Sequence, residues 1–227
     1  CNVADVGPWT CISDSCSEVE AAEATSTTEF LDEVLDIACF VAVDPTNKLV
    51  VVAFRGTDTL RNWLEDILFL RVACSFGSGC TAHAGFLLSW ASVQSDVFDG
   101  VASAVASNPE YEIIVTGHSL GGAIATLAGA SLRDAGYLCD IYTYGSPRIG
   151  NDVFANDVTA QAGSEYRVTH FDDPVPRLPP ILDSDMSAPS IGSQMGLPPR
   201  TITRLPILKY VKESQIRSAT RGLEDSM

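Results

Sequence analysis

The stretch that most constrains this chain is residues 111–136, where an apolar run passes directly into a glycine- and alanine-rich segment. "YEIIVTG" (111–117) predicts a short buried strand, because its apolar residues are mostly β-branched. "SLGGAIATLAGASLRDAG" (119–136) predicts a helix that ends at Gly136. A strand that passes into a helix without a linker is typical of an α/β sheet, in which helices connect parallel strands.

Further strands and helices alternate on both sides of this unit. Residues 38–44 and 49–54 predict two strands around the turn "PTNK", and residues 139–145 and 165–171 predict two more. Residues 85–109 predict a helix that stops at Asn108-Pro109. Its apolar residues recur at helical spacing, namely at Phe86, Trp90, Val93, Val97, Val101 and Val105. The alternation predicts an α/β fold with a mostly parallel central sheet and helices on both faces.

Length and composition set the class of protein. With 227 residues, 46% of them hydrophobic and 19% charged, the chain predicts one globular domain of ordinary size. It has no run of about 18 apolar residues, so we expect no transmembrane segment. The net charge of −15 argues against nucleic acid as a partner, because phosphates would be repelled. The chain begins at Cys1 without Met or a signal peptide, which predicts a mature form or a fragment.

Two close pairs of cysteines, Cys11 with Cys16 and Cys74 with Cys80, lie in turn-rich segments without neighbouring histidines. This pattern favours short-loop disulfides over a zinc site. Reduced thiols are the other alternative. Disulfides predict an oxidising compartment, and hence a secreted, extracellular protein.

Gly117-His118-Ser119-Leu120-Gly121 matches the G-x-S-x-G pattern at the junction of the predicted strand and helix. Small flanking residues let the strand and helix pack closely while the serine hydroxyl stays free. The helix N-terminus behind it favours developing negative charge. These features favour Ser119 as a nucleophile. The alternative is that Ser119 only caps the helix.

Longer motifs carry a family resemblance. Together they resemble the filamentous-fungal class 3 triacylglycerol lipases, to which feruloyl esterases are related. The resemblance covers residues 1–181 and implies an α/β-hydrolase fold and a serine hydrolase of carboxylic esters. Its motifs are "FRGT" (54–57), "GHSLGG" (117–122), "YGSPRIGN" (144–151) and "VTHFDDPVPRLPP" (168–180), with "TCISDSCSEVE" (10–20) similar to the family's N-terminal disulfide loop.

The resemblance assigns roles to individual residues. It implies that Ser119 is the nucleophile and that Asp173 is the acid that orients the imidazole. Asp172 is the competing acid and is better explained as a turn residue. The backbone N–H groups of Leu120 and Thr57 would form the oxyanion hole, with the Thr57 hydroxyl as a further donor. The alternative for Thr57 is a turn hydroxyl at a strand end.

The segment after the "FRGT" motif resembles the family's lid. In "TLRNWLEDI" (59–67), Leu60, Trp63, Leu64 and Ile67 form one apolar stripe of a short helix. A lid that opens at a lipid–water interface implies an acylglycerol or other ester substrate at that interface. The alternative is an ordinary helix that faces the core. This chemistry implies no cofactor and no metal, and we expect a monomer.

The general base is missing from this scheme. In an α/β hydrolase the catalytic histidine follows the acid along the chain. The chain has His83, His118 and His170, and none of them follows Asp173. His118 adjoins Ser119 but should point away from it at the turn, and His83 and His170 are interpreted as structural.

The tail explains the missing base. Residues 182–227 match nothing in the family and have no periodic pattern, which is typical of disorder. The reading frame can be shifted so that the third base of each codon is read with the first two bases of the next codon. In that frame, "DSDMSAPSIGS" (183–193) can encode FRHVSPEYWI. "LPILKYVKE" (205–213) can encode SDIKVCEG in the same way. Both strings are family-like, so we interpret the tail as a frameshifted sequence on a C-terminally incomplete lipase domain.

Three functions remain open at this point. The first is a triacylglycerol lipase that acts on long-chain acylglycerols through an acyl-enzyme on Ser119. The second is a feruloyl-type esterase of plant cell-wall esters. The third is a catalytically impaired lipase-like product. In the family, Cys1 pairs with a C-terminal cysteine, which would be lost here, and Cys39 and Cys139 are expected to be buried thiols.

The frameshift is testable on the gene itself. We expect the nucleotide sequence across codons 178–190 to show one base lost, or two gained, near Leu182 relative to a family-like frame. An intact frame with no family-like alternative downstream would contradict the interpretation.

Overall fold

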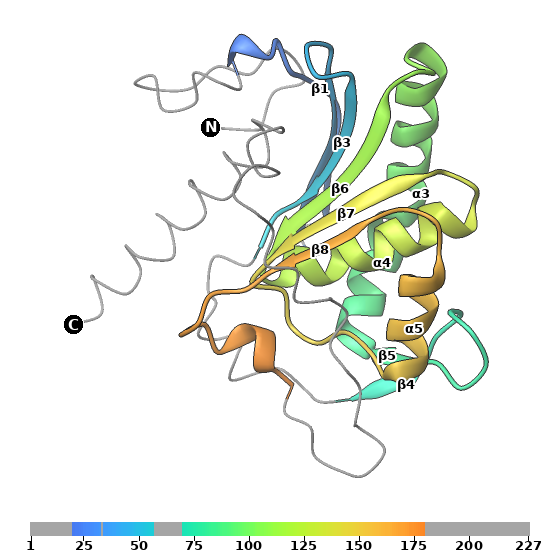
Figure 1. Ribbon diagram of the computed structural model, residues 1–227, viewed down its shortest axis with the longest axis vertical. Coiled ribbons are helices and arrows are strands. Elements are labelled where there is room, and N and C mark those ends of the chain that lie inside the picture. Colours follow the sequence, from blue (N-terminus) through green and yellow to red (C-terminus); the bar gives the residue numbers. More distant parts are fainter. Residues whose placement is uncertain (1–19, 33, 57–69, 180–227) are drawn as a thin grey trace.

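The computed structural model describes residues 20–32, 34–56 and 70–179 (Figure 1). Its main sheet has six strands in the order β1-β2-β3-β6-β7-β8. They are β1 (Thr25–Asp32), β2 (Ile37–Asp44), β3 (Leu49–Phe54), β6 (Glu112–His118), β7 (Cys139–Tyr144) and β8 (Glu165–Val168). A second, two-stranded sheet joins β4 (Arg71–Ala73) to β5 (Thr81–His83). The helices are α3 (Ala84–Ser107), α4 (Leu120–Asp134), α5 (Asp152–Ala160) and the 3₁₀ turn η2 (Val175–Arg177).

The direction of the strands decides where a site can form. β1, β2 and β3 pair antiparallel, whereas β3, β6, β7 and β8 pair parallel. The parallel strands are joined by α3, α4 and α5, because parallel pairing requires a long crossover connection. Their C-terminal ends therefore lie at one edge of the sheet, where ligands bind in open α/β folds. The predicted α/β fold with a mostly parallel sheet is confirmed.

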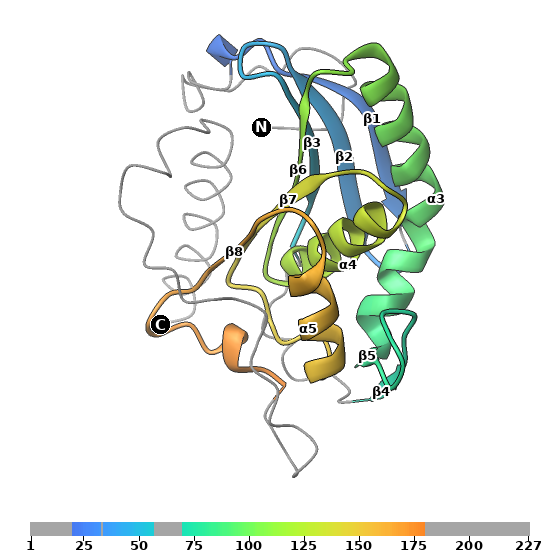
Figure 2. The same cartoon turned by 45° about the vertical axis from the view of Figure 1, so that its right-hand side comes forward.

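One face of the sheet packs against all three of these helices (Figure 2). The buried cluster joins Val50, Val52 and Val115 of the sheet to α3, α4 and α5. The stripe predicted on α3 is confirmed, since Phe86, Trp90, Val93, Val97 and Val101 are buried there and Val105 packs half-buried against the same cluster. No helix in the described ranges is long and apolar enough to cross a membrane.

The opposite face of the sheet also carries a buried cluster. It includes Val51 and Ile114, which alternate with the residues that face the helices, and Tyr144 at the end of β7. Every residue of β3 is consequently buried, as expected for a central strand covered on both faces. Because α3, α4 and α5 all lie on the first face, the second layer of helices remains a prediction.

Strand β8 is shorter than predicted and ends at Val168 instead of residue 171. Among the described strands it pairs with β7 alone, and the last pair in the register is Tyr144 with Val168. Beyond that pair, the N–H of Gly145 donates to the Val168 carbonyl at 2.8 Å and the β7 chain turns away with φ 57°. The strand thus ends where its partner ends. Strands β1, β4 and β5 and helix α5 were not predicted from the sequence.

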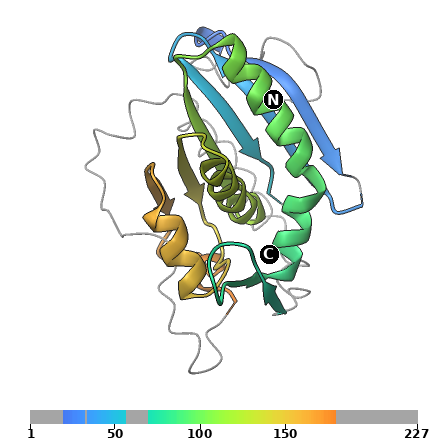
Figure 3. The same cartoon turned by 90° about the vertical axis from the view of Figure 1, so that its right-hand side faces the viewer.

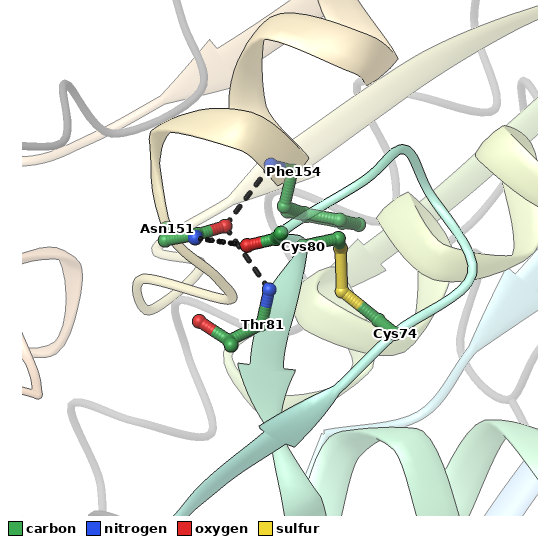
Figure 4. The surroundings of a disulfide bond; sticks show 6 residues. Cys74, Cys80, Thr81, Asn151 and Phe154 are labelled. Carbon is green, nitrogen blue, oxygen red and sulfur yellow. Dashed lines mark hydrogen bonds between the residues drawn. A yellow bond between two sulfur atoms is a disulfide. The ribbon is translucent and has the colours of Figure 1, made fainter.

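The predicted Cys74–Cys80 disulfide is present, with the two Cα atoms 5.2 Å apart (Figure 4). Asn151 ties its loop to the N-terminus of α5. The Asn151 Oδ1 accepts from the N–H groups of Thr81 at 3.1 Å and Phe154 at 3.2 Å. Its Nδ2 donates to the Gly79 carbonyl at 2.9 Å. One amide therefore caps a helix and fixes the disulfide loop.

The two cysteines expected to be buried thiols are confirmed. Cys39 on β2 and Cys139 on β7 are free and buried. Burial raises the pKa of the Cys39 thiol to about 12 and that of Cys139 to about 11. The Cys11–Cys16 pair lies outside the described residues.

Substitution of Asn151 tests this junction. We expect Asn151→Ala to lower the free energy of unfolding by roughly 2–3 kcal/mol, because a helix cap and two further hydrogen bonds disappear together. Urea denaturation of the oxidised protein, followed by circular dichroism, measures the loss. Asn108→Ala is the matched control, since Asn108 makes one side-chain bond at 2.9 Å to the Ala104 carbonyl. Equal losses in the two variants would contradict the role given to Asn151.

Candidate active site

Ser119 occupies the turn between β6 and α4 in a strained backbone conformation. Its φ of 53° and ψ of −123° lie in a region that a non-glycine residue rarely adopts. The N–H of Ser119 donates to the Tyr144 carbonyl at 2.9 Å, and the N–H of Gly122 donates to the Ser119 carbonyl at 3.0 Å. The first bond fixes the turn to β7 and the second begins the helix.

The glycines on either side of Ser119 are required by close packing. A Cβ on Gly117 would overlap the carbonyl of Gly121, and one on Gly121 would overlap the carbonyl of Phe54 at the end of β3. The ends of β3 and β6 and the first turn of α4 therefore meet backbone to backbone. This contact explains the spacing of G-x-S-x-G.

The Ser119 hydroxyl is available for chemistry. Although Ser119 stands at the N-cap position of α4, its side chain makes no capping hydrogen bond, so the alternative of a simple helix cap is wrong. The residue is 2% exposed, and its Oγ has no hydrogen-bond partner in the part of the chain that the structure describes. A buried hydroxyl without a partner is costly unless a substrate or a base completes it.

The predicted oxyanion donor Leu120 is the first residue of α4. Its N–H therefore has no partner within the helix and lies at the positive end of the helix dipole. An oxyanion that forms on a carbonyl beside Ser119 would be stabilised there. The second predicted donor, Thr57, lies outside the described residues.

The loop after β8 carries Asp173. The Asp173 Oδ1 accepts from the Val175 N–H at 2.9 Å, and the Asp173 N–H donates to the His170 carbonyl at 3.2 Å. Its Oδ2 lies 2.8 Å from the point where a Cβ on Gly145 would stand. Asp173 is half-buried at the C-terminal edge of the sheet, whereas Asp172 is exposed. This contrast supports Asp173 as the acid and Asp172 as a turn residue.

Two arginines fasten the acid loop to the sheet. Arg167 Nη2 donates to the carbonyls of Ser146 at 2.7 Å and Pro176 at 3.0 Å. Arg148 Nη1 donates to the carbonyls of Pro179 at 2.8 Å and of Arg177. Burial and the charge of Arg148 lower the pKa of Arg167 to about 10, while the charge of Asp173 opposes the shift. The carbonyls of Pro176, Arg177 and Pro179, bound by the two arginines, thereby fix the segment that follows Asp173.

His118 lies beside the acid rather than the nucleophile. Its Nε2 is 3.4 Å from the position that a Cβ on Gly145 would take, next to the Asp173 carboxylate. Burial lowers the pKa of His118 from its usual 6.5, and the negative charge of Asp173 raises it in part. The prediction that His118 points away from Ser119 agrees with this placement.

The other two histidines lie elsewhere. His83 ends β5, is buried, and has its ring 4.3 Å from that of Phe86. The backbone N–H of His83 donates to the Ile149 carbonyl at 2.9 Å, which fits the predicted structural role. His170 is exposed in the loop after β8, where its Nδ1 accepts from the Asp172 N–H at 3.4 Å.

Sequence reasoning missed the support around the acid. Gly145, Arg148 and Arg167 were not singled out, although the first two lie in "YGSPRIGN" and the third in "EYRVTHF". A charged residue between Tyr166 and Val168 in a predicted strand is the signal that could have identified Arg167 as a half-buried arginine. The proposed lid residues Leu60, Trp63, Leu64 and Ile67 lie outside the described residues. Within the described ranges, no group of three His, Cys, Asp or Glu side chains could hold a metal ion.

Comparison with known proteins agrees with this geometry. Residues 51–183 match the model of the family described as lipase (class 3), which is more than half of the chain. The secreted mono- and diacylglycerol lipase 1 of Fusarium solani is 46% identical over 181 residues, which are 80% of this chain and 54% of the relative. The lipase of Rhizomucor miehei is 36% identical over 177 residues, covering 76% of this chain and 48% of the relative.

Solved structures show the same fold. The crystal structure of the mono- and diacylglycerol lipase from Aspergillus oryzae superposes with a TM-score of 0.73 at 43% identity, covering 77% of this chain and 65% of that chain. A mutant lipase from Penicillium cyclopium gives a TM-score of 0.73 at 46% identity, covering 78% and 66%. The chain spans about half the length of the curated relatives that it matches.

The closeness of His118 to Asp173 predicts how the pKa of His118 responds when the charge of Asp173 is removed. We expect NMR to give a His118 pKa below 6.5, and Asp173→Asn to lower it further, because the carboxylate that opposes the effect of burial is removed. Asp172→Asn, at the exposed neighbour, is the control and should leave the His118 pKa unchanged. A rise in the pKa of His118 in Asp173→Asn would contradict the pairing.

The same shift links stability to pH. A histidine whose pKa is lowered by folding binds protons less readily in the folded than in the unfolded protein. The contribution of His118 to stability is therefore present above its unfolded pKa and is lost as the pH falls through and below about 6.5.

Proposed function

Since the chain belongs to the class 3 lipase family, we propose that it derives from a secreted serine hydrolase of carboxylic esters, with long-chain acylglycerols as substrates. The observation that carries the proposal is Ser119, a buried serine with φ 53° and an unpartnered hydroxyl at the N-terminus of α4. No structural role in the described residues accounts for that hydroxyl, whereas nucleophilic attack on an ester does.

The proposed reaction uses Ser119 and Leu120 of the described residues together with a general base that lies outside them. The Ser119 Oγ attacks the ester carbonyl carbon and gives its proton to a general base. The negative charge then forms on the carbonyl oxygen, within reach of the Leu120 N–H. Collapse of this intermediate expels the alcohol, which takes the proton from the base, and leaves an acyl-enzyme on Ser119. Water attacks the acyl-enzyme by the same route, releasing the fatty acid and restoring the serine.

Asp173 is the proposed orienting acid. Its half-buried carboxylate accepts from the Val175 N–H and would hold an imidazole and stabilise the imidazolium formed during attack. The printed chain has no histidine after Asp173 to supply that imidazole. A serine hydrolase without one triad member keeps only about 10³–10⁴-fold acceleration over water.

The proposed substrate class draws support from named relatives. Two of them are secreted mono- and diacylglycerol lipases, from Fusarium solani and Penicillium cyclopium. A lid over residues 59–67, which the sequence predicts, would make hydrolysis depend on a lipid interface. The Cys74–Cys80 disulfide supports an oxidising, extracellular location.

The frameshift near Leu182 remains part of the proposal. The family match ends at residue 183, next to the point where the charge balance changes. Residues 1–180 hold 8 Lys and Arg against 24 Asp and Glu, whereas residues 181–227 hold 6 against 5. We therefore expect the in-frame protein, and not the printed chain, to turn over substrate efficiently.

Hydrolysis assays test the proposal with the in-frame protein and the printed chain side by side. Emulsified diolein and triolein should be hydrolysed by the in-frame protein, and methyl ferulate should not. Ser119→Ala should lower kcat by more than about 10³-fold and abolish labelling by a fluorophosphonate. Ser89→Ala, a buried serine on α3, is the matched control and should keep full activity. Full activity of the printed chain would refute the triad assignment, and methyl ferulate as the preferred substrate would refute the substrate class.

A further inference from the structure

Exposed apolar side chains gather at one edge of the molecule. Among the described residues, all the exposed large apolar side chains but one lie at or next to the C-terminal edge of the parallel strands. The exception is Leu138, which precedes β7 and lies at the opposite edge. The others are Leu31, Val34, Leu35, Leu70, Val72, Leu88 and Phe171.

The strand order places two of these groups on either side of Ser119. β1 runs in the same direction as the parallel strands, so the β1–β2 turn projects from the edge that carries Ser119. In the order of the sheet, β2 is two strands from β6 on one side, and β8 is two strands from it on the other. With neighbouring strands about 4.8 Å apart, the turn and the loop after β8 each start about 10 Å from the nucleophile strand.

The β1–β2 turn presents its apolar residues on a fixed backbone. Asp32 Oδ1 accepts from the N–H groups of Val34 at 2.9 Å and Leu35 at 3.0 Å. Asp36 forms an ion pair with Arg55, the residue that follows β3. Val34 is 93% exposed although its backbone is held in this way. Because these N–H groups are already paired, removing the turn from water leaves fewer unsatisfied donors.

The start of α3 extends this apolar surface. The Ala84 N–H donates to the Leu70 carbonyl at 2.9 Å, and Leu88 lies one turn further along α3. Helix α3 also contacts β1, the strand that leads into the β1–β2 turn. Figure 3 shows the blue β1 arrow ending beside the green α3 helix.

We propose that the β1–β2 turn, through Val34, and the loop after β8, through Phe171, are two anchors that dock the protein onto an electrically neutral lipid surface. Phe171 is 85% exposed two residues before Asp173. Because the apolar anchors lie on both sides of Ser119, the edge of the sheet that carries Ser119 faces the lipid surface. The net charge of −15 and the acidic Asp32 and Asp36 beside the anchor oppose an anionic surface. The proposal rests on the proposed function, and it concerns residues other than the predicted lid.

Vesicle binding tests the anchors independently of turnover. The full chain, carrying Ser119→Ala so that no lipid is consumed, is sedimented with phosphatidylcholine vesicles that contain dioleoylglycerol. Val34→Ser and Phe171→Ser should each weaken partitioning about tenfold, and the double variant about a hundredfold. Leu138→Ser is the matched control at the opposite edge and should bind as the parent does. Adding phosphatidylglycerol to the vesicles should weaken binding by every variant.

Several outcomes would overturn the proposal. They are a parent that does not bind the neutral vesicles, a double variant that binds as tightly as the parent, a Leu138→Ser variant that is equally weakened, or tighter binding to the anionic vesicles. Concentration-dependent dimers that dissociate on Val34→Ser would assign the surface to a second copy of this chain. Circular dichroism confirms that each variant is folded. Failure of the hydrolase proposal would show separately, if the in-frame protein with Ser119 intact did not hydrolyse a dissolved short-chain ester, a reaction that needs no anchor.

Discussion

The backbone contact between β6 and α4 at Gly117 and Gly121 is the constraint on which the site depends. Because no side chain fits between them, the helix begins directly behind the strand end and forces Ser119 into its φ of 53°. Such a conformation costs about 1–3 kcal/mol. The cost is offset by the buried cluster of the first face, to which α4 contributes eight residues between Leu120 and Leu132. Core packing thus holds the serine in position before any substrate arrives.

The acid is positioned by a different set of contacts. Arg148 and Arg167 bind backbone carbonyls within η2 and just after it, so the segment that follows Asp173 is held by hydrogen bonds. Burying two neighbouring guanidinium groups is unfavourable, and the lowered pKa of Arg167 reflects this cost. The carbonyl acceptors and the nearby Asp173 carboxylate compensate for it. The nucleophile and the acid are consequently placed by independent parts of the fold.

The sequence predicted those parts that follow from periodic apolar residues. The central strands β3 and β6 and helices α3 and α4 are long apolar segments, and their bounds agree with the predictions to within two residues. Ser119 was predictable because its motif combines with that pattern. β1 was not, since "TSTTEFLD" alternates only weakly and pairs with β2 through a register shift between Ser26 and Thr28. The contacts of Asn151, Arg148 and Arg167 join residues far apart in the chain, which a single sequence does not reveal.

The two buried thiols have a consequence for how the protein forms the Cys74–Cys80 disulfide. Thiol–disulfide exchange requires a thiolate, and a pKa of about 12 or 11 keeps Cys39 and Cys139 protonated once β2 and β7 have formed. Before that, both are ordinary reactive thiols that compete for Cys74 and Cys80. The six-residue separation of the native pair favours the correct partner kinetically, because short loops close fastest. Formation of the sheet then prevents Cys39 and Cys139 from forming wrong disulfides. Mispairing is therefore lowest when the hydrophobic core assembles early.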